Sequence, residues 1–272
     1  MKRVRLFKFR SCFTVIIIIF IFIFQSCENY DLTITTDRNY PTTYRKLDDA
    51  TLIQMRKDFA LSNPFLSSSI TDYGFCGFLS NLLPAPSTVR IPDLTKAEAI
   101  NLTKSFISQN STLLGIKSTS EVTFSRIDSF IIYDGSVKWF LSSNTQKNDG
   151  LEVSDTYLNF SLTNGKMTSC DGNWYSSIFI PPIINYDETS ARKLLLNKIV
   201  YLSDIAGHPI PMTITVKSLK TAKFSKLIYP LRTTDKIELH VVWVVNIPDV
   251  YYVVYMDVMT GDIIGGYPTV LS

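Results

Sequence analysis

The amino-acid sequence predicts a mixed α+β fold built from two consecutive units, each a helix followed by an antiparallel sheet. One helix signature starts at Thr95 and a second at Asp187, and each precedes several runs in which apolar and polar residues alternate. The pair Asn164-Gly165 between two such runs indicates a tight hairpin, because both central positions of that turn need positive φ. Helix followed by strands, twice over, is typical of α+β proteins.

Residues 1–26 are typical of an export signal. A basic head precedes the apolar run Phe13–Phe24, which is followed by Gln25, Ser26 and Cys27. A helix that spans a bilayer needs about 20 apolar residues, so this shorter run favours a cleaved signal. An uncleaved anchor is the alternative interpretation.

The end of this run resembles a bacterial lipobox, in which a small residue precedes a cysteine that is acylated. Ser26 and Cys27 fit that pattern, so we predict lipid attachment at Cys27. The alternative is cleavage by an ordinary signal peptidase, which would leave a free thiol. The prediction places the protein in a bacterial cell envelope, anchored to the outer membrane on its periplasmic face or at the cell surface.

The charge balance gives no indication of a nucleic-acid partner. The chain has 27 Lys and Arg and 24 Asp and Glu, but five of the basic residues and none of the acidic ones lie in residues 1–26. Residues 27–272 therefore carry 22 basic against 24 acidic residues, a net charge of −2. A nucleic-acid-binding protein would instead present a basic surface.

Two cysteines remain once Cys12 leaves with the signal and Cys27 takes lipid. Cys76 and Cys170 are a disulfide candidate in an oxidising compartment, with two unlinked buried thiols as the alternative. The chain has no CxxC motif, so the cysteines indicate neither a redox site nor a zinc site.

The first predicted unit spans residues 47–185 and follows a polar tether, residues 27–46. A short helix is expected from Asp48 to Pro64, and residues 65–92 give mixed signals without a clear fold. Thr95 and Glu98 form a capping box for a helix over residues 95–110, whose apolar face we expect to contain four residues: Ala99, Leu102, Phe106 and Ile107. Strands are expected at 121–127, 136–143, 155–162 and 166–175.

The second predicted unit spans residues 186–272. Asp187 is the expected N-cap of a helix whose face continues through Leu195, Ile199 and Leu202. Strands are expected at 212–216, 223–231, 236–247 and 251–258, and a last strand follows a tight turn at Gly261. The two longest runs are apolar on both faces, which is typical of central strands covered by helix.

Several short motifs together resemble the fungalysin/thermolysin-type propeptide followed by a PepSY domain, the prosegment of thermolysin-like metallopeptidases. Over about residues 95–270 these are Leu113-Leu114-Gly115, Gly150-Leu151-Glu152-Val153, Gly165-Lys166-Met167 with Gly172-Asn173-Trp174, and the runs "KLIYPL", "LHVVWVVNI" and "YYVVYMDVMTGDII". The resemblance implies two successive helix-plus-sheet units. In that family the prosegment helps its own catalytic domain to fold and blocks its cleft until it is cleaved.

We expect no catalytic site, cofactor or metal in this chain. A thermolysin-like zinc site needs HExxH, but the two histidines, His208 and His240, have no Glu or His at ligand spacing. No peptidase sequence follows residue 272, so the resemblance implies action on a separate secreted metallopeptidase, as inhibitor or folding helper. The alternative is a surface binding or assembly module for peptide, glycan or envelope protein. The many Tyr and Phe residues fit either a packed core or such a binding platform.

Overall fold

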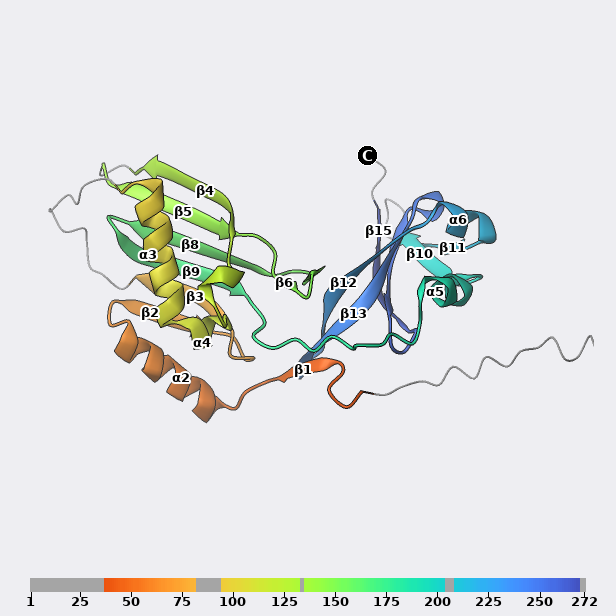
Figure 1. Cartoon of the computed structure of the whole chain (residues 1–272), viewed down its shortest axis with the longest axis horizontal. Helices are drawn as coiled ribbons and strands as arrows, with labels where there is room; N and C mark the ends of the chain where they lie inside the picture. Colours follow the sequence, from red (N-terminus) through yellow and green to blue (C-terminus); the bar gives the residue numbers. More distant parts are fainter. Residues whose placement is uncertain (1–36, 82–93, 133–134, 204–207, 270–272) are drawn as a thin grey trace, which may run out of the picture. The chain divides into compact units, whose positions relative to one another are not determined.

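The computed structural model describes residues 37–81, 94–132, 135–203 and 208–269. It contains helices and antiparallel sheets, which confirms the predicted mixed α+β class (Figure 1). The predicted signal, Cys27 and most of the predicted tether lie outside the described residues. Among the residues described, no helix combines the length and apolar character needed to cross a bilayer.

The first sheet has six strands, all paired antiparallel, in the order β2-β3-β9-β8-β5-β4. Their bounds are β2 Leu66–Ile70, β3 Cys76–Asn81, β4 Phe124–Ile131, β5 Val137–Ser143, β8 Tyr157–Thr163 and β9 Lys166–Asn173. The hairpin between β8 and β9 turns at Asn164 and Gly165 with φ of 49° and 72°, as the sequence predicts. A separate short ribbon joins β6 (Lys147–Asn148) to β7 (Leu151–Glu152).

Helices accompany this sheet: α2 (Asp49–Ser62), α3 (Lys96–Gln109), α4 (Ser111–Leu114) and the short 3-10 helix η1 (Thr119–Glu121). The predicted capping box is present, since Thr95 accepts from the Glu98 backbone N–H while the Glu98 carboxylate accepts from Thr95 N–H. Helix α3 buries Ala99, Phe106 and Ile107 against the sheet core. Leu102, which we predicted to share that face, is instead 38% exposed, because the buried position one turn before Phe106 is Thr103.

The second sheet has five strands in the order β1-β13-β14-β15, with β12 paired to β13. Their bounds are β1 Thr42–Arg45, β12 Lys223–Arg232, β13 Lys236–Ile247, β14 Tyr252–Asp257 and β15 Ile263–Pro268, and the 3-10 helix η2 (Pro248–Val250) joins β13 to β14. Strand β13 is central, as predicted, because β12 flanks it on one side and β1 and β14 on the other.

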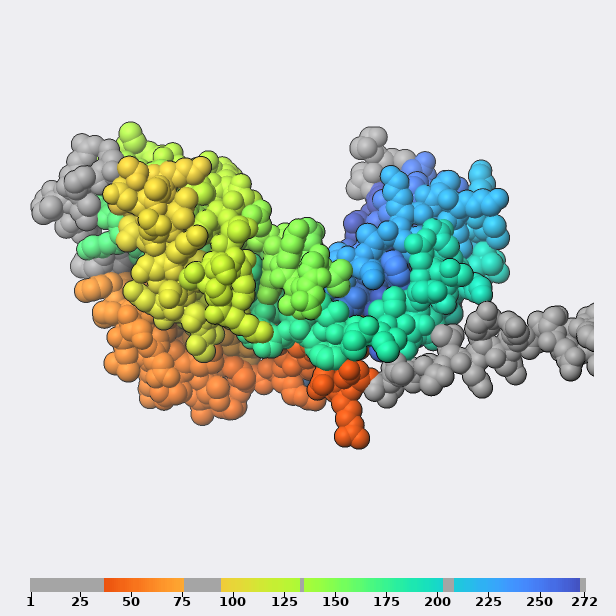
Figure 2. Space-filling view, viewed as in Figure 1, coloured from red at the N-terminus to blue at the C-terminus, as the bar shows by residue number. Residues whose placement is uncertain are grey.

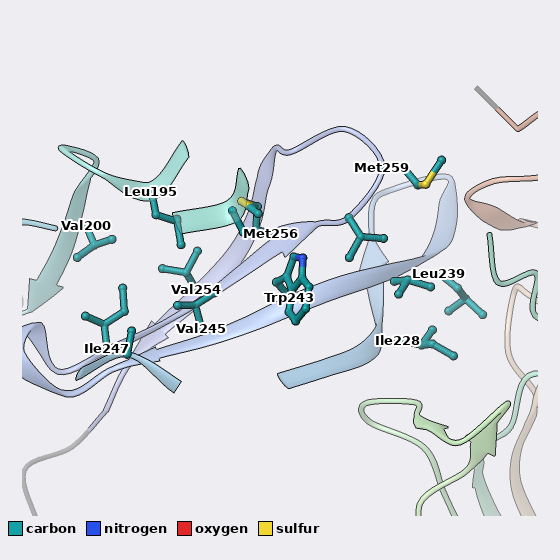
Figure 3. Close-up of a cluster of buried hydrophobic side chains, with 14 of the residues drawn as sticks. Leu195, Val200, Ile228, Leu239, Trp243, Val245, Ile247, Val254, Met256 and Met259 are labelled. Carbon is teal, nitrogen blue, oxygen red and sulfur yellow. The ribbon is translucent and has the colours of Figure 1, made fainter. Parts of the chain in front are cut away.

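One face of this sheet carries a continuous apolar core (Figure 3). Alternate residues of β13 point into it, namely Ile237, Leu239, Val241, Trp243, Val245 and Ile247. The covering layer consists of α5 (Glu188–Leu195), the hairpin β10 (Ile199–Ser203) and β11 (Pro209–Thr213), and α6 (Val216–Thr221) (Figure 1). Phe75, Val153 and Tyr175 also join this core, and Val153 forms a parallel bridge with Ile228 of β12.

Three elements differ from the sequence predictions. Thr42–Arg45, inside the predicted tether 27–46, form β1 and pair with β13, so the chain becomes regular earlier than expected. The helix that begins after Asp187 ends at Leu195, because Asn197 adopts a left-handed φ of 63° and the β-branched and aromatic residues beyond it form β10. Ile199 and Leu202 therefore belong to a strand. Val216, which we expected to end a strand, starts α6, whose N-cap is Thr215.

Candidate functional site

The second sheet has another face, opposite its apolar core, which we call the tyrosine face. Residues directly opposite in an antiparallel pair share a face, and so do alternate residues of one strand. The register places the side chains of six notable residues on it: Tyr229, Glu238, His240, Tyr255, Asp257 and Tyr267. None of these is a site residue in the sequence analysis, where His240 has no Glu or His at zinc-ligand spacing.

A buried polar cluster lies at one end of this face, formed by Tyr40, His240 and Asp257. His240 Nδ1 lies 2.5 Å from Asp257 Oδ2, and because an ionised carboxylate only accepts, Nδ1 is the donor. The Tyr40 hydroxyl donates to the same Oδ2 at 2.8 Å, and its ring meets the His240 ring edge-on at 5.9 Å between centroids. Asp257 is fully buried, so these bonds replace the water that the carboxylate would otherwise bind.

Tyr40 also closes a gap in the sheet. On one side of β13, β1 pairs as far as Leu239 and β14 pairs from Val242 onward, so neither strand reaches Val241. The Tyr40 hydroxyl accepts the Val241 backbone N–H at 2.9 Å. The Val241 carbonyl accepts from Val258 N–H at 3.1 Å. The tyrosine thus satisfies a backbone donor where β13 changes partners, and ties it to Asp257.

Asp257 also organises the turn that leads into β15. Its Oδ1 accepts the backbone N–H groups of Met259 at 2.6 Å and Thr260 at 2.9 Å. Burial by itself raises the pKa of the Asp257 carboxyl, but the hydrogen bonds from His240, the two backbone amides and Tyr40 outweigh it, so its pKa is lowered. Burial first, and the neighbouring Asp257 charge second, raise the pKa of Tyr40. Asp257 is therefore a charged acceptor at neutral pH.

The other nitrogen of His240 is enclosed rather than offered to solvent. His240 Nε2 has no hydrogen-bond partner among the described residues, and the closest carboxylate oxygen, Glu238 Oε2, lies 3.9 Å away. Glu238 Oε1 already pairs with Lys236 Nζ at 2.6 Å. The Asp257–His240 pair thus joins β13 to β14 at this end of the tyrosine face.

A row of three tyrosines covers the middle of the tyrosine face. The Tyr229 and Tyr255 rings lie 4.5 Å apart between centroids, and Tyr255 and Tyr267 lie 6.0 Å apart. Because β12 and β14 flank β13, the first two rings meet above β13, and Val242 between them is fully buried. Burial, followed by contact with Tyr267, raises the pKa of Tyr255 to about 12. The row is a neutral aromatic surface whose outer member, Tyr267, is 48% exposed.

The row ends at a free sheet edge. Within the described residues β15 pairs with β14 and with no strand on its other side. Gly265 and Gly266 lie in this strand, and Tyr267 and Pro268 follow them. An added Cβ at Gly265 would lie 3.1 Å from Tyr255 Cδ2, so a small residue there leaves room for the tyrosine row. A strand with unpaired backbone groups beside exposed aromatic rings can accept an extended peptide.

Some of the predicted site residues lie in the part of the chain that the structure describes. Cys170 lies buried in β9 opposite Leu79 of the neighbouring strand β3, and Cys76 starts β3 opposite Ile70 of β2. The Cys76–Cys170 disulfide stays a prediction, and reduction with mass analysis would test it. His208 is exposed beside β11. No group of three potential metal ligands occurs in the part of the chain that is described. Lipid attachment at Cys27 falls outside that part.

Comparison with known proteins places the chain in no established family. No protein-family model matches it, and no curated protein matches it significantly. Among solved structures, the Bacillus megaterium YpeB C-terminal domain is similar, with a TM-score of 0.32 and 9% sequence identity, over 83% of this chain and 99% of that chain. At this level the likeness is a distant one.

Proposed function

We propose that this protein is a non-catalytic, lipid-anchored envelope protein that binds an extended polypeptide of a separate metallopeptidase and modulates it, as inhibitor or folding helper. The observation that carries the proposal is the free edge of β15 beside the row formed by Tyr229, Tyr255 and Tyr267. A strand added to β15 would gain backbone hydrogen bonds. Every second side chain of the added strand would then lie on the tyrosine face, beside Tyr267.

The proposal combines this geometry with the prosegment resemblance of residues 95–270, including the two-unit, propeptide/PepSY-like organisation. The Asp of the motif "DVMTGD" is Asp257, and its four accepted hydrogen bonds account physically for a carboxylate at this position. They position β14 and the turn into β15, and hence the free edge. The motif thus has a role in building the proposed binding surface.

The test mixes residues 27–272 carrying Cys27→Ser with several thermolysin-like peptidases and measures peptide hydrolysis and refolding yield. We expect inhibition or improved refolding with at least one enzyme. Tyr267→Ala should weaken the effect, since Tyr is enriched among the few interface residues whose truncation costs about 2 kcal/mol or more. Tyr157→Ala is the matched control, because Tyr157 is 44% exposed on β8 of the other sheet. Unchanged hydrolysis and refolding across all enzymes would refute the proposal.

The second candidate is a surface binding or assembly module for peptide, glycan or envelope protein. The tyrosine row favours it, because exposed aromatic rings also stack on sugars and on peptide side chains. Glycan and peptide arrays distinguish the two candidates. Glycan binding that is lost in Tyr267→Ala, together with no effect on any peptidase, would favour the module.

A further inference from the structure

The covering layer of the second sheet differs in charge from the rest of the chain. Residues 187–223 contain six basic residues and three acidic ones, a net charge of +3, whereas residues 27–272 together carry −2. Five of the six are exposed lysines: Lys193, Lys198, Lys217, Lys220 and Lys223. Two of the three acidic residues, Asp187 and Glu188, lie at the start of α5, where they suit the helix dipole.

Exposed apolar side chains lie among these lysines. They are Leu194 at 37%, Ile199 at 53%, Tyr201 at 58% and Val216 at 60% exposure. In the β10–β11 hairpin, Val200 and Met212 pair and face the core, so Ile199 and Tyr201 point to the outside. We call these four apolar residues and the five lysines the basic–apolar patch. Residues of α5 and α6 form a continuous surface here (Figure 2).

A shallow pocket of about 280 Å³ joins α5 to α6 within this patch. Its lining combines three cations with three aliphatic side chains: Arg192, Lys193, Leu196, Val216, Leu219 and Lys220. Arg192 is held in place, because it pairs with Glu188, donates to the Leu219 carbonyl and lies 4.2 Å from the centre of the Phe224 ring. It joins the two helices, while the lysines stand at the rim of an aliphatic floor.

We propose that the basic–apolar patch is a contact surface for an anionic lipid bilayer. Lysine ammonium groups attract lipid phosphates at about 1 kcal/mol each near a charged membrane, and neighbouring apolar side chains enter the boundary between headgroups and acyl chains. Apolar side chains at the centre with lysines around them fit a bilayer surface better than a soluble anion, which would require convergent polar donors. The contact would fix which side of the protein faces the membrane, and would leave the tyrosine face for a partner.

The test separates this contact from the lipid anchor. Residues 27–272 with Cys27→Ser, which carry no acyl chain, are mixed with vesicles of phosphatidylcholine, with and without phosphatidylglycerol, and binding is measured by co-sedimentation. We expect binding to the anionic vesicles, weakened by added salt. The triple variant Lys193→Glu, Lys217→Glu and Lys220→Glu should bind more than about tenfold less.

A matched variant changes the net charge equally at a distance from the patch. Lys57→Glu, Lys104→Glu and Lys117→Glu replace exposed lysines of α2, α3 and the segment after α4, and should retain most of the binding. Tyr201→Ser with Val216→Ser should lower binding while circular dichroism stays unchanged. Equal loss in both lysine triples, equal binding to neutral vesicles, or saturation by soluble glycerol phosphate at the same affinity would each overturn the proposal. Loss of the Cys27 anchor in cells would leave this result unaffected.

Discussion

The two sheets satisfy their polar groups in different ways. In the first sheet, β4–β5 and β8–β9 are neighbours in sequence, and a charged pair such as Arg126–Asp128 is exposed. In the second, Tyr40 and Val241, 201 residues apart in sequence, are hydrogen-bonded, and Asp257 is fully buried. Where β13 changes partners from β1 to β14, backbone and side-chain groups are left inside the fold, and these need specific partners.

Each sheet has a different vulnerable point. The first sheet depends on close packing of backbone, most tightly at Gly172 of β9, where an added Cβ would lie 2.0 Å from the Tyr157 carbonyl oxygen. The second depends on the cluster of Tyr40, His240 and Asp257. Substitutions at these points test this difference in stability, each against a control substitution at a less crowded or more exposed position.

The largest effect is expected for Gly172→Ala. Its φ of 142° disfavours any side chain, and the carbonyl that a Cβ would meet is backbone, so β8 and β9 must separate. We expect a loss of about 4 kcal/mol or more in the free energy of unfolding, measured in urea. Gly165→Ala is the control, since its nearest atoms lie 3.9 Å away and it adds only the cost of positive φ, about 1–2 kcal/mol. Equal losses would contradict the close-packing argument.

Asp257→Ala should come next. It removes the acceptor of Tyr40 and His240 and of two backbone amides while these stay buried, so we expect a loss of about 3–5 kcal/mol in urea unfolding. The matched change in the first sheet, Asp128→Ala, breaks an exposed pair and should cost less than about 1 kcal/mol. A small effect at Asp257 would show that the buried cluster contributes little to stability.

Tyr40→Phe should have an intermediate effect. The ring stays, but the Val241 N–H loses its acceptor and Asp257 loses a donor, so we expect a loss of about 1–3 kcal/mol in thermal or urea unfolding. Tyr73→Phe is the control, because its hydroxyl donates to the Thr233 carbonyl at 3.2 Å in an exposed position. If both variants lost the same stability, the gap-closing role of Tyr40 would be excluded.

The smallest effect concerns pH. The folded pKa of Asp257 is lowered from 3.8, because hydrogen bonds to the carboxylate outweigh burial. Its contribution to stability is therefore fully present above about pH 4 and declines as the pH falls through the folded pKa. The wild-type protein should lose stability below pH 4 more steeply than Asp257→Asn, as followed by urea unfolding at successive pH values. Parallel curves would mean that Asp257 does not titrate differently on folding.

Much of the local structure could be predicted from residue patterns, because near neighbours fix it. Thr95 and Asp187 start helices where expected, since their side chains accept backbone donors within the same turn. The end of the second helix could not be predicted from apolar spacing. Ile199 and Leu202 continue the helical spacing of Leu195, although they lie in a strand. The backbone at Asn197 decides between helix and strand.

The candidate site was less predictable. The sequence offered His240 without a partner at diagnostic spacing, because Asp257 lies 17 residues away and reaches it only through the register of β13 and β14. An available signal was that both residues fall on the same face of adjacent predicted strands, so a hairpin register would have brought them close. No pattern in the sequence indicates that Tyr40, in the predicted tether, would complete the cluster.

Local sequence sets the helix starts after Thr95 and Asp187, the Asn164-Gly165 hairpin and the long apolar strand β13, because each depends on interactions over a few residues or on burial of whole strands. Only the tertiary structure decides that β1 joins β13 and that Tyr40, His240 and Asp257 meet. These contacts depend on which distant segments pack together. Which segments pack together depends on the shape of the folded sheet and on its unpaired polar groups. No repeating pattern of residues in the sequence indicates it.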